Sequence, residues 1–233
     1  MRKTHSIYPL LTLFIAIITL TAFQQQKKES QPDNPIGELV IGNQTWMQEN
    51  LNVERFRNGD TIPEARTIQD WRLAGRERKP AWCYYNNDPA NGAKYGKLYN
   101  YFAVADPRGL APEGWRVPSQ DDWFVLMNFL GGKKARRTAG NELKSTSGWL
   151  KGGNGTNSTG FNARPGGWRD GVSFIIYKQG FLGEGHMGYW WATDYFKRTL
   201  TGLAISLSKA DGRIFRDYEA ELNCGFSVRC IKE

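Results

Sequence analysis

Beyond residue 35, short apolar runs alternate with breaks rich in glycine and asparagine, and this pattern constrains the fold more than any other feature. Aromatic and β-branched residues bounded by such breaks are typical of β-strands joined by turns. The segments predicted to form strands are 37–51 (with a turn at Gly42-Asn43), 81–88, 96–104, 172–179, 188–196, 201–208, 212–218 and 226–233. Residues 89–96, PANGAKYG, are predicted to form the turn between segments 81–88 and 96–104.

The sequence PSQDDWFVLMNFLGG marks one helix. Ser119 is a suitable N-cap, Asp122 places an acidic group in the first turn, and Gly131-Gly132 ends the helix. The apolar residues that share one helical face are Trp123, Leu126, Met127 and Leu130. A second short helix is predicted around residues 139–146, and residues 151–171 form a loop rich in glycine and asparagine. The fold class predicted is therefore α+β, with small antiparallel sheets, about two helices and long loops.

The closing segment, GFSVRCIKE, carries an alternating pattern. Phe226, Val228 and Cys230 are expected to face the core, and Arg229 is expected to face the opposite side of the sheet, because successive side chains of a strand point to opposite faces. A strand this apolar at the end of the chain predicts long-range contacts.

The first 23 residues have the pattern of a signal peptide. Arg2 and Lys3 precede an apolar stretch from residue 9 to residue 23, which is shorter than the roughly 20 residues of a membrane-spanning helix. An uncleaved N-terminal anchor is the alternative. Phe23 occupies the place of a lipidated cysteine after Leu20-Thr21-Ala22, so no lipid anchor is expected. Residues 24–35 are polar and read as a linker, and 36–233 form one domain of a secreted or envelope protein.

The formal net charge of +8 is concentrated in two basic clusters, RLAGRERKP at residues 72–80 and GGKKARR at residues 131–137. Such clusters can attract nucleic acids, but no helix-turn-helix, zinc-finger or RNA-recognition pattern accompanies them. A nucleic-acid partner is therefore not expected. The clusters indicate a solvated basic face, or attraction to anionic surface glycans.

The chain has three cysteines, Cys83, Cys224 and Cys230. If residues 224–230 are extended, the Cα atoms of the last two lie roughly 20 Å apart at about 3.3 Å per residue. A disulfide needs about 4.4–6.8 Å between Cα atoms, so this pair is not expected to bridge. Cys83 paired with either Cys224 or Cys230 is the feasible disulfide. Three reduced, buried thiols are the alternative.

Six motifs together resemble the Fibrobacter succinogenes major paralogous domain family, and they cover the chain after the linker. In chain order they are IGNQTWMQENLNVERFRNGDTIP, AWCYYNNDPANGAKYGKLYNYFAV, APEGWRVPSQDDWFVLMNFLGG, STGFNARPGGWRDG, YWWATD and GFSVRCIKE. The resemblance implies an exported or surface-attached bacterial protein. It also implies a distant relation to C-type-lectin-like folds, which include the formylglycine-generating enzyme. A bridge from Cys83 would tie the last strand to an early one, as a lectin-like fold requires.

The related enzyme holds copper with a close pair of thiols, and GFSVRC resembles its final strand rather than that pair. Residues 195–223 supply no second thiol, so oxidase activity and a copper cofactor are not expected. No His, Cys and carboxylate set has zinc spacing, and residues 86–92, NNDPANG, read as an Asx-turn rather than a calcium loop. No metal or other cofactor is expected.

A candidate ligand site is predicted where aromatic and polar residues share adjoining loops. A saccharide site stacks the apolar face of a sugar on an aromatic ring and holds the hydroxyls with polar side chains. The candidate residues are Trp168, Arg169, Asp170, Glu184, His186 and Tyr189. In the alternative structural interpretation, the PGGWR segment folds inward and covers a sheet edge.

Taken together, the sequence predicts an exported, non-enzymatic module that binds a glycan or a protein ligand through its loops. No catalytic residue is assigned in this interpretation. One alternative is a hydrolase that uses Asp170, Glu184 and His186. Another is a purely structural surface domain.

Overall fold

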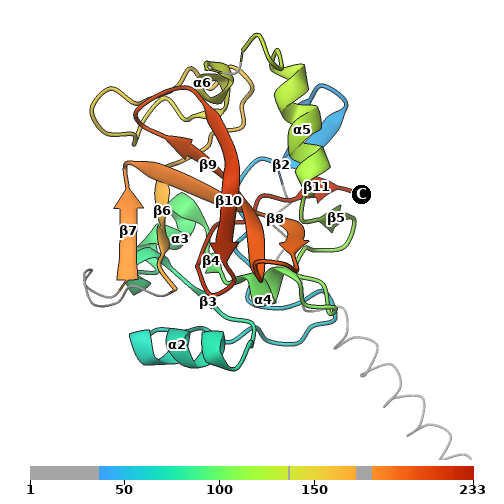
Figure 1. The fold of residues 1–233 in the computed structure, drawn as a ribbon, viewed down its shortest axis with the longest axis vertical. Helices are drawn as coiled ribbons and strands as arrows, with labels where there is room; N and C mark the ends of the chain where they lie inside the picture. The colour runs from blue at the N-terminus through green and yellow to red at the C-terminus, as the bar shows by residue number, and fades with distance from the viewer. Residues whose placement is uncertain (1–36, 136, 172–179) are drawn as a thin grey trace, which may run out of the picture. The chain divides into compact units, whose positions relative to one another are not determined.

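The computed structural model describes residues 37–135, 137–171 and 180–233, which form a mixed α and β fold. Within these ranges, no helix has the length and apolar character needed to cross a membrane. The predicted signal peptide, linker and strand 172–179 lie outside the described residues. The contacts between Cα atoms group residues Ile36–Glu233 into one unit. Figure 1 shows small sheets in the middle of this unit, with short helices around them.

A four-stranded sheet joins the two ends of the domain. Its strands, in spatial order, are β1 (Glu38–Ile41), β2 (Gln44–Met47), β11 (Ile231–Lys232) and β5 (Trp115–Arg116). The predicted turn at Gly42-Asn43 connects β1 and β2, and Gly42 has a φ of 61°, which glycine adopts readily. All the neighbouring pairs are antiparallel, and Ile231 lies opposite Trp46.

A five-stranded sheet forms the largest β element of the described residues. Its strands, in spatial order, are β10 (Ile214–Glu221), β9 (Thr201–Ser208), β8 (Met187–Phe196), β6 (Gly166–Arg169) and β7 (Phe181–Glu184). The pairing of β6 with β8 is parallel and the other pairs are antiparallel. A third, two-stranded sheet pairs β3 (Trp82–Cys83) with β4 (Leu98–Tyr99). The antiparallel sheets confirm the predicted sheet type. Strands β8, β9 and β10 confirm the strands predicted at residues 188–196, 201–208 and 212–218.

Five α-helices lie within the described residues, which is more than predicted. They are α2 (Ile68–Arg76), α3 (Ala90–Tyr95), α4 (Tyr101–Val104), α5 (Gln120–Phe129) and α6 (Ala139–Leu143). A short 3₁₀ helix also spans Tyr85–Asn87. Helix α5 confirms the prediction, because Ser119 and Asp122 exchange both hydrogen bonds of a capping box.

Helices α3 and α4 correct the predicted turn 89–96 and the predicted strand 96–104. The side chain of Asn100 accepts a hydrogen bond from the Ala103 amide, and this cap starts α4 directly after β4. Helix α2 begins with a second capping box, between Thr67 and Asp70. The sequence prediction does not include α2, because the basic cluster at residues 72–80 indicates charge and not a helix.

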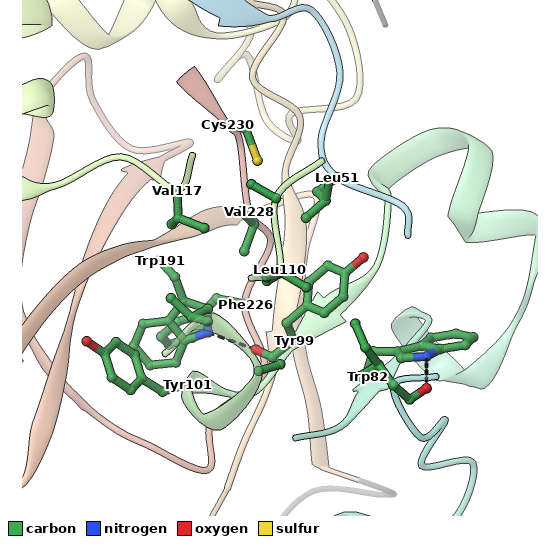
Figure 2. Close-up of a cluster of buried hydrophobic side chains, with 14 of the residues drawn as sticks. Leu51, Trp82, Tyr99, Tyr101, Leu110, Val117, Trp191, Phe226, Val228 and Cys230 are labelled. Atoms are coloured by element: carbon green, nitrogen blue, oxygen red, sulfur yellow. Dashed lines mark hydrogen bonds between the residues drawn. The ribbon is translucent and has the colours of Figure 1, made fainter. Parts of the chain in front are cut away.

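The closing segment lies between two apolar clusters. Phe226, Val228 and Cys230 belong to the first cluster, which Figure 2 shows around the Trp191 and Tyr99 rings. Ile231 belongs to the second cluster, with Trp46 and Trp190. The alternation of the segment is therefore confirmed, but both of its sides are buried.

Arg229 is 1% exposed, and its guanidinium ties the closing segment to two distant loops. It donates hydrogen bonds to the Asn50 Oδ1 atom at 2.8 and 2.9 Å, to the Gln48 carbonyl at 2.9 Å and to the Phe161 carbonyl at 2.7 Å. Its guanidinium carbon also lies 4.5 Å from the centre of the Phe161 ring. The guanidinium N–H groups thus pair with backbone carbonyls of irregular loops, which do not form the regular hydrogen bonds of a sheet.

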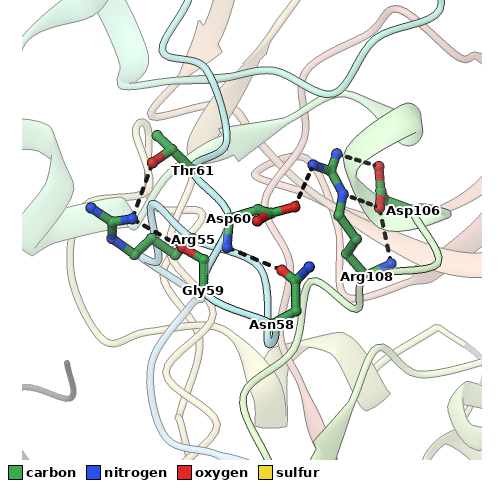
Figure 3. Close-up of polar contacts among 7 residues, drawn as sticks. All are labelled: Arg55, Asn58, Gly59, Asp60, Thr61, Asp106 and Arg108. Atoms are coloured by element: carbon green, nitrogen blue, oxygen red, sulfur yellow. Dashed lines mark hydrogen bonds and ion pairs between the residues drawn. The ribbon is translucent and has the colours of Figure 1, made fainter. Parts of the chain in front are cut away.

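A polar network fixes the loop that follows the first hairpin. Figure 3 shows Arg108 between Asp106 and Asp60, at 2.8 and 3.1 Å. Asn58 accepts a hydrogen bond from the Asp60 amide, and Arg55 donates to the Gly59 carbonyl across the same turn. The network thus links the turn at residues 55–61 to residues 106–108 by hydrogen bonds and ion pairs.

The three cysteines are free thiols, which corrects the predicted disulfide between Cys83 and either terminal cysteine. Cys83 lies in a third apolar cluster with Trp71 and Phe181, whereas Cys230 lies in the first cluster. Cys224 packs at the edge of the first cluster. The three thiols therefore pack in apolar surroundings without a cross-link, as the alternative interpretation predicts.

Candidate functional site

A cavity of about 410 Å³ opens between helix α5, the loop after it and the first half of strand β10. Figure 1 shows α5 and α6 at the top of the view, where β10 begins. The lining residues are Phe124, Met127, Asn128, Gly132, Lys133, Ala139, Arg213, Ile214, Phe215 and Arg216. We call this the α5–β10 cavity. Its volume is within the range of about 300–1,000 Å³ that is typical of small-ligand sites.

The floor of the cavity is apolar because it is the outer edge of the second core cluster. Ala139 is buried in that cluster, and Met127 and Ile214 pack against it while half-buried. Met127 reaches this position because it shares the apolar face of α5 with Leu126 and Trp123. The same residues that anchor the helix thus provide a hydrophobic base for a ligand.

Two aromatic rings form the walls, and an arginine side chain stacks on each ring. The Arg216 guanidinium carbon lies 4.5 Å from the centre of the Phe124 ring, and that of Arg213 lies 4.8 Å from the centre of the Phe215 ring. A guanidinium stacked on a ring keeps its N–H groups at the edge, where they can bind a further group. The cavity therefore combines apolar surface with fixed hydrogen-bond donors.

The cations of the cavity differ in their partners. Arg213 pairs with Asp211 at 2.7 Å. Burial opposes ionisation of Asp211, but hydrogen bonds from Arg213 outweigh it, and the pKa of the carboxyl is lowered. Among the side chains that the structure describes, which do not include those of residues 136, 172–179, 217 and 218, no carboxylate lies within 4.0 Å of the charged groups of Lys133 or Arg216. These two exposed cations thus form no ion pair with the carboxylates that the structure describes.

A bulge in β10 directs consecutive side chains toward the cavity. The pairing of β10 with β9 shifts register between Phe215 and Tyr218. In a regular strand, Phe215 and Arg216 would point to opposite faces, whereas both line the cavity. Bulges are known to redirect side chains in this way and are frequent beside functional sites.

The turn between β9 and β10 is held by a buried lysine. Lys144 is 2% exposed, and its Nζ atom donates to the carbonyls of Ser208 and Asp211 at 3.2 and 2.9 Å. Burial lowers the pKa of this amine. The Gly140 amide, on α6, adds a hydrogen bond of 2.7 Å to the Gly212 carbonyl. These hydrogen bonds therefore fix the turn that leads into β10 at Arg213.

The six residues predicted as a ligand site do not line the α5–β10 cavity. Trp168 and Tyr189 do lie together, with ring centres 5.1 Å apart, and Tyr189 stacks on Phe226 at 4.9 Å. Both rings are half-buried against the first core cluster. The arrangement therefore agrees with the alternative in which the PGGWR segment folds inward.

Arg169 departs from its predicted position on a ligand-binding loop. It is 0% exposed, and it donates to the carbonyls of Ala65 and Thr67, both at 2.9 Å. The guanidinium also stacks on the rings of Trp71 and Phe181. Its functional groups therefore hold α2 against the sheet and cannot reach a ligand in solvent.

The alternative hydrolase set is spread along the β6–β7 ladder. Glu184 lies opposite Gly166 at one end, and Asp170 donates its amide to Gly180 beyond the other end. Four residue steps separate the two acidic residues along the ladder, or roughly 13 Å at about 3.3 Å per residue. His186 is exposed in the turn after Glu184. The structure thus does not bring Asp170 to the other two residues.

Glu184 is engaged by neighbours on α3. It accepts a hydrogen bond from the Tyr95 hydroxyl at 3.0 Å, and Lys94 lies 3.5 Å from the same oxygen. Within residues 37–135, 137–171 and 180–233, no group of three or more His, Cys, Asp or Glu side chains could hold a metal ion.

The sequence carried only one signal for the α5–β10 cavity. Lys133 stands in the basic cluster 131–137, which was interpreted as a solvated or glycan-attracting face. Phe124 and Phe215 are far apart in the sequence, and no local pattern joins them. Their pairing depends on the packing of α5 beside β10.

Comparisons with known proteins identify a family and no individual relative. Residues 39–232 match the model of the Fibrobacter succinogenes major domain. No curated protein matches the chain. No solved structure matches it either.

Proposed function

The chain belongs to the Fibrobacter succinogenes major domain family, and we propose that it is an exported surface or envelope module that binds a glycan without catalysis in the α5–β10 cavity. The support for export is the signal-like pattern of residues 1–23. The observation that carries the binding proposal is the cavity itself, with its apolar floor, two aromatic walls and donors at the rim.

The composition of the cavity suits a sugar ring better than a purely apolar ligand. A sugar presents C–H groups on one face and hydroxyls around its edge. Phe124, Phe215 and Met127 offer contact to the C–H groups, while Asn128 and the arginines offer hydrogen bonds to the hydroxyls. Sites of this type orient a ligand with a few polar groups on a largely apolar base.

We also propose a C-type-lectin-like relation for the fold. The pairing of β11 with β2 supports it, because the last strand is tied to an early one without a disulfide. Loops outside the sheets then remain free to carry a binding site, as is common for loops on a rigid scaffold.

A glycan array tests the proposed function. The labelled full chain is applied to neutral and acidic oligosaccharides, beside the variant Phe215→Ala and the control Phe129→Ala. Phe129 lies on helix α5, which borders the cavity, and its side chain is 59% exposed, but it does not line the cavity. Binding by the parent and the control, with loss by Phe215→Ala at an unchanged melting temperature, is the expected result. An array without any bound saccharide, or equal binding by both variants, would refute the proposal.

A further inference from the structure

The charges around the α5–β10 cavity have one sign. Lys133, Arg213 and Arg216 line it, no acidic side chain that the structure describes does, and Lys134 and Arg137 are exposed on the adjoining loop. The carboxylate of Asp211 is engaged by Arg213. A neutral sugar would need none of these cations, because hydroxyls can be bound by amides and backbone groups.

We propose that the ligand of this cavity is an acidic saccharide, a sugar ring whose carboxylate is bound by Arg216 and Lys133; this inference rests on the proposed glycan-binding function. The ring lies on the floor formed by Met127 and Ile214. The carboxylate points to the rim, where the two cations have no ion-pair partner among the side chains that the structure describes.

Arg216 is prepared for this contact before a ligand arrives. Its guanidinium already stacks on Phe124, so binding orders fewer side-chain torsions than it would for a free arginine. The register shift after Phe215 keeps its side chain directed to the cavity. The planar guanidinium can bind the two oxygens of a carboxylate in a paired arrangement.

Isothermal titration of the full chain with oligogalacturonate tests the inference. The matched ligand is the methyl ester of the same oligomer, which keeps the rings and removes the charges. The matched variants are Arg216→Gln at the cavity and Arg198→Gln, an exposed arginine in the turn after β8. A sulfated dextran and a single-stranded polynucleotide complete the set of probes.

We expect oligogalacturonate to bind at least about tenfold more tightly than its methyl ester, with the difference reduced at high salt. Arg216→Gln should remove most of this difference, while Arg198→Gln should keep it. Equal binding of the acid and the ester, weakened by Phe215→Ala but not by Arg216→Gln, would overturn the inference and leave the glycan-binding function standing.

Other outcomes also decide the question. Tighter binding of the sulfated dextran or the polynucleotide than of oligogalacturonate would overturn the choice of a sugar carboxylate. No binding of either oligogalacturonate or its ester, together with a blank glycan array, would overturn the proposed function as well. A difference between acid and ester that Arg216→Gln leaves intact would place the acidic site elsewhere.

Discussion

Replacing Arg229 by methionine tests whether one buried cation holds the loops of this domain together. Methionine has a similar length and no donors. The substitution therefore leaves the carbonyls of Gln48 and Phe161 without their charged partner, and it removes two of the hydrogen bonds to Asn50. Trp190 continues to donate to the Asn50 Oδ1 atom at 2.9 Å.

The magnitude follows from two opposing effects. Burial lowers the pKa of Arg229 from 12.5 to about 10, and that difference at about 1.4 kcal/mol per pH unit corresponds to a cost of about 3 kcal/mol, which methionine relieves. Against this, each buried acceptor without a partner costs about 1–3 kcal/mol. Because the lost donor is charged, the upper part of that range applies, at about 1.5–3 kcal/mol for each of the three acceptors Gln48, Phe161 and Asn50. We therefore expect the free energy of unfolding to fall by about 2–5 kcal/mol.

Urea denaturation followed by tryptophan fluorescence measures this change. At about 2–4 °C per kcal/mol for a domain of this size, the melting temperature should also fall by roughly 10 °C. Arg229→Lys keeps the charge but loses the planar donors, so it should fall between the parent and Arg229→Met. Arg198→Met, at an exposed position, should stay within about 0.5 kcal/mol of the parent. A stability of Arg229→Met equal to that of Arg198→Met would refute the reasoning.

Three further predictions concern stability. Burial raises the thiol pKa of Cys83 to about 11 and those of Cys224 and Cys230 to about 12, from 9.0. The contribution of these protonated thiols to the free energy of unfolding is therefore fully present below pH 9 and is lost as the pH rises through 11–12. Urea midpoints that stay level from pH 8 to 11 would contradict this. Ser119→Ala removes the cap of α5 and should cost about 1 kcal/mol in urea denaturation, and an unchanged midpoint would argue against the cap. Deleting residues 225–233 should abolish the cooperative transition in circular dichroism, and a retained parent midpoint would exclude a structural role for this segment.

Local chemistry made some elements predictable. Ser119 and Asp122 are three residues apart, so the capping box that starts α5 is visible in the sequence. The Gly42 turn and strands β8 and β9 follow from equally local patterns. Residues 101–104, Tyr-Phe-Ala-Val, resemble a strand in isolation, but the Asn100 cap makes them helical. In that case a short polar cap outweighed the strand propensity of the residues after it.

The burial of individual residues and the position of the candidate site depend on contacts between residues that are distant in the sequence. The alternation of the closing segment placed Arg229 opposite Val228, but only the fold shows that Phe161 covers the second side. Arg169 was predicted on a loop surface, because nothing near it in the sequence indicates the carbonyls of Ala65 and Thr67. The α5–β10 cavity likewise forms from segments that no periodicity relates.

The position of the closing segment also sets an order on folding. Its residues lie between the two largest apolar clusters, and β11 pairs with β2 from the start of the domain. A growing chain contains these residues only after the rest of the domain has been made, so neither cluster can be completed while residues 226–231 are still in the ribosome. If the protein is exported as proposed, this delay keeps the chain open for translocation. In that case, the native domain forms only after residues 226–231 have emerged on the far side.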